Sequence, residues 1–120
     1  MVVKMIVADG KSMIIDQIAN IINQGGLGTD DTAPAESDTG LNSNTNFGTS
    51  GTIKSVSSTV STKQVVFDYN LPSTDGNGNT YKEFGLSSSS ESKLFNRQTF
   101  ADLSKTSSIE IQVSCAISIE

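Results

Sequence analysis

The sequence contains no histidine, and its only cysteine is Cys115. Histidine is the side chain that most often transfers protons near neutral pH, and it is the commonest metal ligand. Without it, neither Cys115 nor any serine has the base that usually activates a nucleophile. A single cysteine cannot form an internal disulfide, so the fold does not depend on an oxidising compartment. We therefore expect a structural or binding protein without an assembled active site, not an enzyme.

Basic residues are scarce as well. Eight Lys and Arg stand against thirteen Asp and Glu, which gives a net charge of −5 at pH 7. Proteins bind a nucleic-acid backbone with clustered Lys and Arg that displace its counterions, and the basic residues here form no cluster. We expect no nucleic-acid partner.

Long apolar runs are also missing, and hydrophobic residues make up only 35% of the chain. No stretch approaches the ~20 apolar residues that cross a bilayer, and the first residues lack the pattern of a signal peptide. We expect a soluble protein that is made in the cytoplasm and has no membrane partner. The low apolar content of one domain, residues 1–120, predicts a thin core that partner subunits complete.

A helix is predicted at about residues 10–24. Isoleucines recur there at intervals of three and four with polar residues between them, which is typical of a helix that buries one face. The isoleucines of this face are Ile14, Ile15, Ile18, Ile21 and Ile22. Asp9 or Ser12 could cap the start of the helix, and Gly25 with Gly26 would end it.

Residues 25–52 are rich in Gly, Ser, Thr, Asn and Asp, which predicts a long loop. Connections longer than about 12–15 residues are uncommon inside a domain, so this loop is either functional or ordered by a neighbouring chain. We expect it to carry subunit contacts. Its large apolar anchors and acidic side chains are Leu27, Asp30, Asp31, Glu36, Asp38, Leu41 and Phe47.

The apolar pattern changes to a period of two in residues 53–120, which predicts antiparallel strands. Residues 64–71 alternate between apolar and polar side chains, and Pro72 ends that strand. A hairpin follows over residues 81–86 and 94–100. Residues 109–119 give the clearest strand pattern, because every odd position is apolar and Cys115 occupies one of them as a small hydrophobic side chain.

Two motifs only partly match known binding loops. Gly10-Lys11-Ser12 precedes the helix as in a phosphate-binding loop, but Met5 stands where the first glycine belongs. Asp75 opens a segment that imitates a calcium loop, but Thr80 and Leu86 replace its glycine and its bidentate glutamate. Turn chemistry explains both segments.

Glu83 and Arg97 form the one polar pair that the hairpin brings together. If Leu86 pairs with Leu94, Glu83 lies directly opposite Arg97, and an ion pair is geometrically natural. The pair either fixes the register of the hairpin, which we favour, or clamps two subunits together.

Four segments, in order, resemble small virion proteins and tail-fibre modules of tailed phages and related archaeal viruses. Residues 28–41 (GTDDTAPAESDTGL) resemble "GTG-T-AP…SDTxL", although residues 42–46 interrupt the continuation of that pattern. With h for an apolar residue, residues 77–86 (NGNTYKEFGL) are similar to "NGxTIxEhGL", 94–100 (LFNRQTF) to "LhxRxxF" and 103–111 (LSKTSSIEI) to "hxKTSSIEL". The resemblance implies a β-sandwich-like virion component without enzymatic activity or cofactor. It also implies a symmetric oligomer, and a trimer is the order that we expect first.

We therefore expect a mainly β, antiparallel sandwich-like domain with one N-terminal amphipathic helix. In the virion it would be a tail, fibre-attachment or capsid-decoration subunit that assembles with itself and with other virion proteins. The alternative is a receptor- or carbohydrate-binding module, although the chain has no tryptophan on which sugars usually stack.

Overall fold

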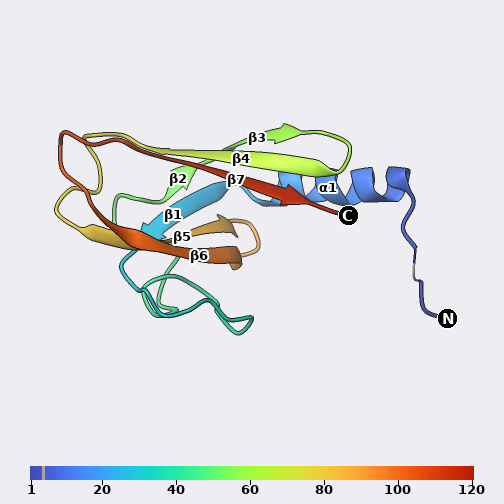
Figure 1. Ribbon diagram of the computed structural model, residues 1–120, viewed down its shortest axis with the longest axis horizontal. Helices are drawn as coiled ribbons and strands as arrows, with labels where there is room; N and C mark the ends of the chain where they lie inside the picture. Colours follow the sequence, from blue (N-terminus) through green and yellow to red (C-terminus); the bar gives the residue numbers. More distant parts are fainter. Residues whose placement is uncertain (4) are drawn as a thin grey trace.

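The computed structural model describes residues 1–3 and 5–120 and places two antiparallel sheets in two layers, with one helix beside them (Figure 1). The helix is α1 (Ala8–Ile21). The first sheet contains β1 (Gln24–Gly28), β2 (Lys54–Ser55), β5 (Thr80–Ser88) and β6 (Lys93–Ser104), in the order β2-β1-β5-β6. The second contains β3 (Ser57–Val60), β4 (Gln64–Leu71) and β7 (Ile111–Ser118), in the order β3-β4-β7. The predicted mainly β, sandwich-like fold with an N-terminal helix is confirmed.

The core lies between the two sheets and follows the alternation of the strands. In β4, Val65, Phe67, Tyr69 and Leu71 are buried while Asp68 faces outward. β7 runs antiparallel to β4 and turns its odd-numbered residues to the same interior. Cys115 is buried opposite Phe67, so it packs as a small hydrophobic side chain.

Tyr69 joins the two sheets. Its ring meets Phe84 of β5 edge-on, with the ring centroids 5.1 Å apart, and its hydroxyl donates a hydrogen bond to the Thr52 carbonyl. Burial raises the pKa of Tyr69 above its usual value. The residue therefore fills the core and pairs its polar end at the same time.

The helix differs from the prediction at both ends. It begins at Ala8, after Val7, and no side chain caps it, so neither Asp9 nor Ser12 has the expected role. Gly25 and Gly26 do not end the helix but belong to β1. A Cβ at Gly26 would overlap the Phe47 carbonyl, so glycine is required for the close approach of two segments of the chain rather than for a helix terminus. In the described part of the chain, no helix is long and apolar enough to cross a membrane.

The hairpin register also differs from the prediction. β5 extends to Ser88, and Gly85 rather than Glu83 lies opposite Arg97, while Glu83 lies opposite Thr99. Ser87 rather than Leu86 pairs with Leu94, and an irregularity between Leu86 and Ser87 shifts the pairing by one residue more. An extra residue of this kind cannot be read from alternating polarity alone.

The predicted loop is shorter than residues 25–52, because its first residues form β1. The remainder crosses the outside of the first sheet and returns to β2 (Figure 1). One of its turns is closed by a bridge between Leu41 and Asn46. Asn42, Ser43 and Asn44 adopt left-handed φ angles of 53°, 61° and 66° there, a conformation that asparagine tolerates better than most residues.

Candidate functional site

Arg97 is the centre of a buried ion-pair network between β5, β6 and the loop. Its side chain is only 4% exposed, and its Nε donates to Glu83 Oε1 at 2.7 Å. Nη1 donates to Asp38 Oδ2 at 3.1 Å, and Nη2 donates to the Asp30 carbonyl at 3.1 Å. Each of the three guanidinium nitrogens thus donates a hydrogen bond within the same chain.

Glu83 completes the network with its second oxygen. Oε2 accepts the backbone N–H groups of Asp30, at 2.8 Å, and Asn42, at 2.9 Å. The carboxylate fits there because Gly28 has no Cβ, which would overlap it. Glu83 and Arg97 therefore fasten two separate parts of the loop to the sheet.

The acidic loop residues are held as carboxylates. Hydrogen bonds from Thr32, backbone first and then side chain, lower the pKa of Asp30. The Ala35 N–H, and then Arg97, lower the pKa of Asp38. Burial alone would lower the pKa of Arg97, but its hydrogen bonds to Glu83 and Asp38 raise it. Arg97 therefore stabilises the ionised forms of both Asp30 and Asp38 in the folded state.

The residues predicted to carry subunit contacts are mostly used inside the chain. Leu27 and Leu41 are fully buried, and Phe47 is half-buried. Asp30 and Asp38 contact Arg97, as described above, whereas Asp31 and Glu36 are exposed. The loop is ordered by its own sheet, and the geometry of Glu83 and Arg97 favours the intrachain interpretation of that pair.

The turn that imitates a calcium loop is tied to two lysines. Lys105 is 1% exposed, and its Nζ donates to the Asn77 side chain at 2.7 Å and to the Ser73 carbonyl at 3.2 Å. Asp75 pairs with Lys54, whose hydrogen bond lowers the pKa of that carboxyl. Among the described residues, no three His, Cys, Asp or Glu side chains gather as metal ligands would.

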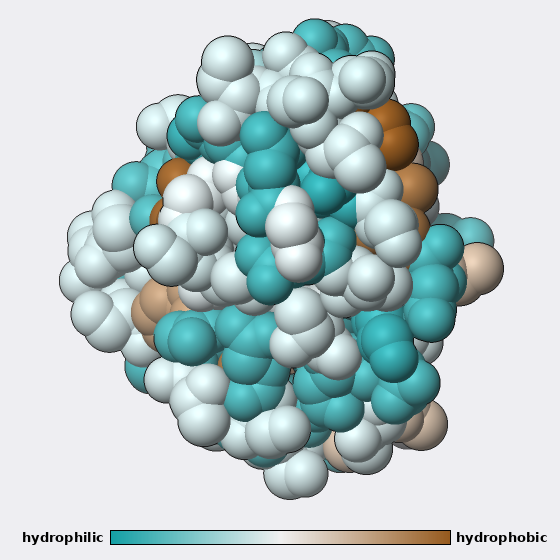
Figure 2. All heavy atoms as spheres, turned by 90° about the vertical axis from the view of Figure 1, so that its left-hand side faces the viewer, coloured by the Kyte–Doolittle hydropathy of each residue, from teal (hydrophilic) through white to brown (hydrophobic). Residues whose placement is uncertain are grey.

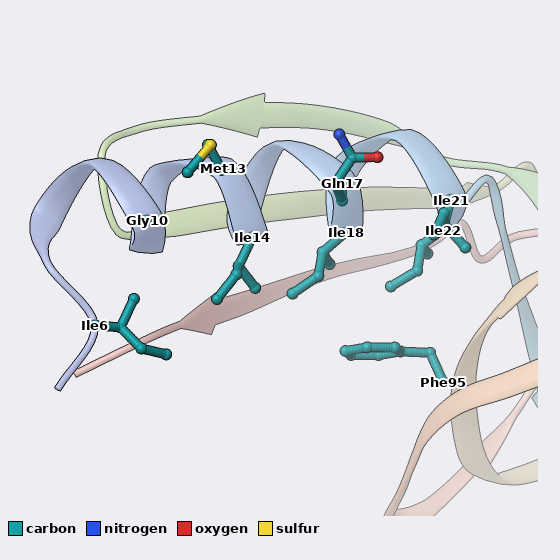
Figure 3. Close-up of a pocket in the computed structure, with 9 residues that line it drawn as sticks. All are labelled: Ile6, Gly10, Met13, Ile14, Gln17, Ile18, Ile21, Ile22 and Phe95. Atoms are coloured by element: carbon teal, nitrogen blue, oxygen red, sulfur yellow. The ribbon is translucent and has the colours of Figure 1, made fainter. Parts of the chain in front are cut away.

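The rest of the chain leaves one side of α1 uncovered. Ile15 and Ile22 are buried against the sheets, but Met13, Ile14 and Ile21 are 65%, 38% and 44% exposed. They border an almost wholly apolar groove of about 560 Å³, which Phe95 of β6 closes on the far side (Figure 3). The single buried face predicted for the isoleucines is therefore wrong.

The residues before the helix are apolar and exposed as well, and Ile6 among them lines the groove. Met1, Val2, Val3, Met5, Ile6 and Val7 are all exposed, by 45% or more. The opposite end of the molecule is mainly hydrophilic, and hydrophobic residues occupy only small separate areas of it (Figure 2). The exposed apolar side chains thus gather at the helix end, which we call the helix surface: residues 1–3 and 5–7, Met13, Ile14, Ile21 and Phe95.

Sequence reasoning missed the helix surface. The five isoleucines at positions 14, 15, 18, 21 and 22 span about 120° of the helix, which is an ordinary width for one buried face, so their spacing gave no sign that Ile14 and Ile21 stay exposed. The surface offers contact area and no reactive group, so what it can do is bind another apolar surface.

In comparisons with known proteins, no family model, no curated protein and no solved structure matches this chain.

Proposed function

We propose that the protein is a non-enzymatic assembly subunit that forms a homo-oligomer through the helix surface. One observation carries this proposal. Met13, Ile14, Ile21 and Phe95 border an apolar groove that is open to solvent, and six exposed apolar residues precede α1 at the same end of the molecule. Exposed apolar surface of this kind marks interaction sites in soluble proteins.

The rest of the structure supports a scaffold role. The loop is fastened by Arg97 and Glu83, and the turn between β4 and β5 is fastened by Lys105, so both are rigid parts of the domain. No buried side-chain nitrogen or oxygen in the described residues lacks a hydrogen-bond partner that a ligand would have to supply. Polar groups that are already hydrogen-bonded within the chain suit a subunit that binds its neighbours through a fixed surface.

A virion is the proposed location, and the four sequence segments quoted above are the support for it. The subunit would serve as a tail, fibre-attachment or capsid-decoration protein, with a trimer as the proposed order and other virion proteins as further partners. Arg97 and Glu83 belong to two of those segments, and Asp30 and Asp38 to a third, so the resemblance coincides with the buried network.

The test of this function has two parts. Sedimentation of the wild-type chain over a wide concentration range should show one closed oligomer, and mass spectrometry of purified particles should find the protein as a stoichiometric component. A chain that stays monomeric at every concentration contradicts the assembly role. Absence from particles contradicts the virion location.

A receptor- or carbohydrate-binding module is a second candidate, because one polar hollow has suitable chemistry. This hollow of about 380 Å³ lies beside Arg97 and is lined by Glu36, Asp38, Asn96 and the exposed ring of Phe95. Carboxylates and amides can bind sugar hydroxyls, and an aromatic ring can stack on a sugar face. Glycan-array binding that is lost in Glu36→Ala, an exposed residue of this hollow, would favour this candidate over a purely structural role.

A further inference from the structure

We infer that Asn77 is a site of covalent modification, at which the side-chain amide is converted to a carboxylate that becomes the counter-ion of the buried Lys105. The reaction is an intramolecular deamidation through the backbone nitrogen of Gly78, and water is its only co-reactant. The inference goes beyond the proposed assembly function and does not depend on it.

Lys105 is a buried cation without a carboxylate partner. The residue is 1% exposed, and its Nζ donates to Asn77 Oδ1 at 2.7 Å, to the Thr106 carbonyl at 3.1 Å and to the Ser73 carbonyl at 3.2 Å. All three acceptors are neutral, and no carboxylate of the described residues lies within 4.0 Å of Nζ. Arg97, whose side chain is also buried, has three carboxylate partners. Because a buried charge is costly unless it is paired, the surroundings of Lys105 lack one negative charge.

The charged side chains around Lys105 are unbalanced. Asp75 pairs with Lys54, whose hydrogen bond lowers the pKa of that carboxyl most, and the charge of Lys105 lowers it further. Two lysines therefore share one aspartate at the end of the sandwich far from α1, where the β4–β5 turn meets the connection between β6 and β7 (Figure 1). Both connections cross between the sheets, so a carboxylate at position 77 would balance the charges and fasten the two crossings together.

Asn77 has the sequence context in which deamidation is fastest. It is the only asparagine of the chain that is followed by glycine. Deamidation begins when the backbone nitrogen of the next residue attacks the side-chain carbonyl carbon, and a side chain on that next residue hinders the approach. Gly78 has no side chain, and no neighbouring atom lies within 4 Å of the place where its Cβ would be. Asn77 is itself exposed, so water reaches the site.

Lys105 also activates the carbonyl group that must be attacked. Its ammonium group lies 2.7 Å from Asn77 Oδ1, so it withdraws electrons from the carbonyl carbon and stabilises the negative charge that develops on Oδ1 during attack. One contact opposes the reaction, because the Gly78 N–H donates to the Lys105 carbonyl at 2.9 Å. That hydrogen bond must open before the nitrogen can attack, and we therefore expect a conversion that takes days.

The two steps exchange one ammonia for one water. In the first step, the Gly78 nitrogen gives its proton to solvent and bonds to Cγ of Asn77, while Nδ2 takes up a proton and leaves as ammonia. In the second step, water adds to Cγ of the resulting succinimide ring, the bond from Cγ to the Gly78 nitrogen breaks, and that nitrogen regains a proton. Position 77 is then an aspartate, and the backbone is unchanged.

The product fits the site. An oxygen of the new carboxylate can keep the 2.7 Å contact with Lys105, which becomes an ion pair and a stronger hydrogen bond. The bond that Asn77 Nδ2 donates to the Ser73 carbonyl, at 3.0 Å, is lost, but that carbonyl keeps Lys105 as a donor. Opening of the succinimide at the backbone carbonyl would instead give isoaspartate, which lengthens the backbone and moves the carboxylate away from Lys105. The folded turn is therefore complementary to aspartate and not to isoaspartate.

The first experiment follows Asn77 by mass spectrometry. The wild-type chain is incubated at mildly alkaline pH for several days, and the peptide between Lys63 and Lys82 is compared with that of a sample digested at the start. The same peptide contains Asn70 and Asn79, which are internal controls because leucine and threonine follow them. The mass gain of replacing NH₂ by OH should appear at Asn77 and at neither control. An Asn77 that stays intact, or that converts no faster than the controls, overturns the inference.

The second experiment tests the role of the ammonium group, with Lys54→Met as the matched control for Lys105→Met. Conversion of Asn77 should be about 10-fold slower or more in Lys105→Met, because one donor to a developing oxyanion contributes on the order of 10²–10³ in rate. Lys54→Met removes the other lysine of the network and should convert at the wild-type rate. An equal or higher rate in Lys105→Met would contradict the activation by Lys105.

The third experiment measures the stabilisation that the new charge provides. Asn77→Asp should raise the thermal midpoint at pH 7 by about 2–5 °C, whereas Asn79→Asp, the same change two residues further on, should not raise it. Lys54, Asp75 and Lys105 are common to wild type and variant, so the gain reports the new carboxyl group and should shrink below about pH 4 as that group becomes protonated. An Asn77→Asp midpoint at or below that of the wild type at pH 7 overturns the counter-ion role.

Discussion

At the scale of single residues, Arg97 and Glu83 connect the sheet to a loop of about two dozen residues that contains little regular structure. Taking two charges out of water is costly, and in this network the hydrogen bonds to Asp30, Asp38 and Asn42 offset that cost. The pair matters less as a source of stability than as a device that allows only one position of the loop.

Removing the charge of one residue of the Glu83–Arg97 pair should destabilise the fold more than removing both charges. Arg97→Met leaves the fully buried Glu83 carboxylate without its cation, and we expect the free energy of unfolding to fall by about 3 kcal/mol or more. Replacing Glu83 by Gln in the same chain should recover part of that loss. Urea denaturation measures both, and a loss under about 1 kcal/mol in Arg97→Met would show that the network is dispensable.

Acid should release the loop before it unfolds the sandwich. The pKa values of Asp30 and Asp38 are lower in the folded than in the unfolded chain, so their stabilising effect is complete above the usual pKa of about 4 and is lost as the pH falls through the folded values. The protection of the Asp30 and Asn42 amides against hydrogen exchange, taken relative to the intrinsic rate at each pH, should therefore fall below about pH 4 while β4 stays protected.

A matched control supports the assignment of this acid effect. Asp38→Asn should remove part of the pH dependence, whereas Asp31→Asn, whose side chain is 71% exposed, should leave it unchanged. If exchange in the loop and in β4 accelerated together, the network would not be the group that titrates.

The Glu83–Arg97 contact could be predicted at this scale, but its surroundings could not. Opposite charges on facing strands of a hairpin indicate a contact whether or not the register is right, because a long arginine side chain also reaches a diagonal neighbour. The partners Asp30 and Asp38 lie more than fifty residues away in sequence, and only the folded loop brings them to Arg97.

At the scale of secondary structure elements, strands that alternate were predicted well and elements with glycine were not. β4 and β7 follow period-two patterns without interruption, so their orientation was clear from the sequence. β1 contains Gly25, Gly26 and Gly28, which give no such pattern and resemble a helix end. Their role is close packing against Phe84, Phe47 and Glu83, which a sequence does not reveal.

The orientation of β7 gives a simple stability test. Val113 lies opposite Tyr69 and packs against the core, so Val113→Asp should lower the free energy of unfolding by about 2 kcal/mol or more. Gln112→Asp, on the solvent side of the same strand, should cost about 0.5 kcal/mol or less. Thermal and urea unfolding would measure both, and equal losses would contradict the observed facing of β7.

At the scale of the whole molecule, the polar composition and the helix surface both follow from how the few apolar residues are distributed. The chain has few apolar residues, and many of those it has lie outside the core, at one end. The sequence therefore indicated a protein that partners complete, but it pointed to the polar loop as the contact. The loop is hydrogen-bonded to its own sheet, whereas the exposed apolar residues gather at the helix end, where we propose the contact.

Assembly through α1 should also stabilise the domain. Because the oligomer buries the helix surface, its thermal midpoint should rise with protein concentration, whereas the midpoint of Ile21→Glu should not depend on concentration. Scanning calorimetry of the two proteins at matched concentrations provides the comparison. A wild-type midpoint that is independent of concentration would indicate that association does not contribute to stability.

The most direct test of the account is the solution mass, by sedimentation equilibrium, of the wild-type chain, of Ile21→Glu and of a control. The control is Ile53→Glu, because Ile53 is 43% exposed but lies outside the helix surface. Assembly through the helix surface predicts one discrete multiple of the subunit mass for the wild type and for Ile53→Glu, and a monomer for Ile21→Glu. A wild-type monomer, or an oligomer equally present in all three proteins, would contradict it.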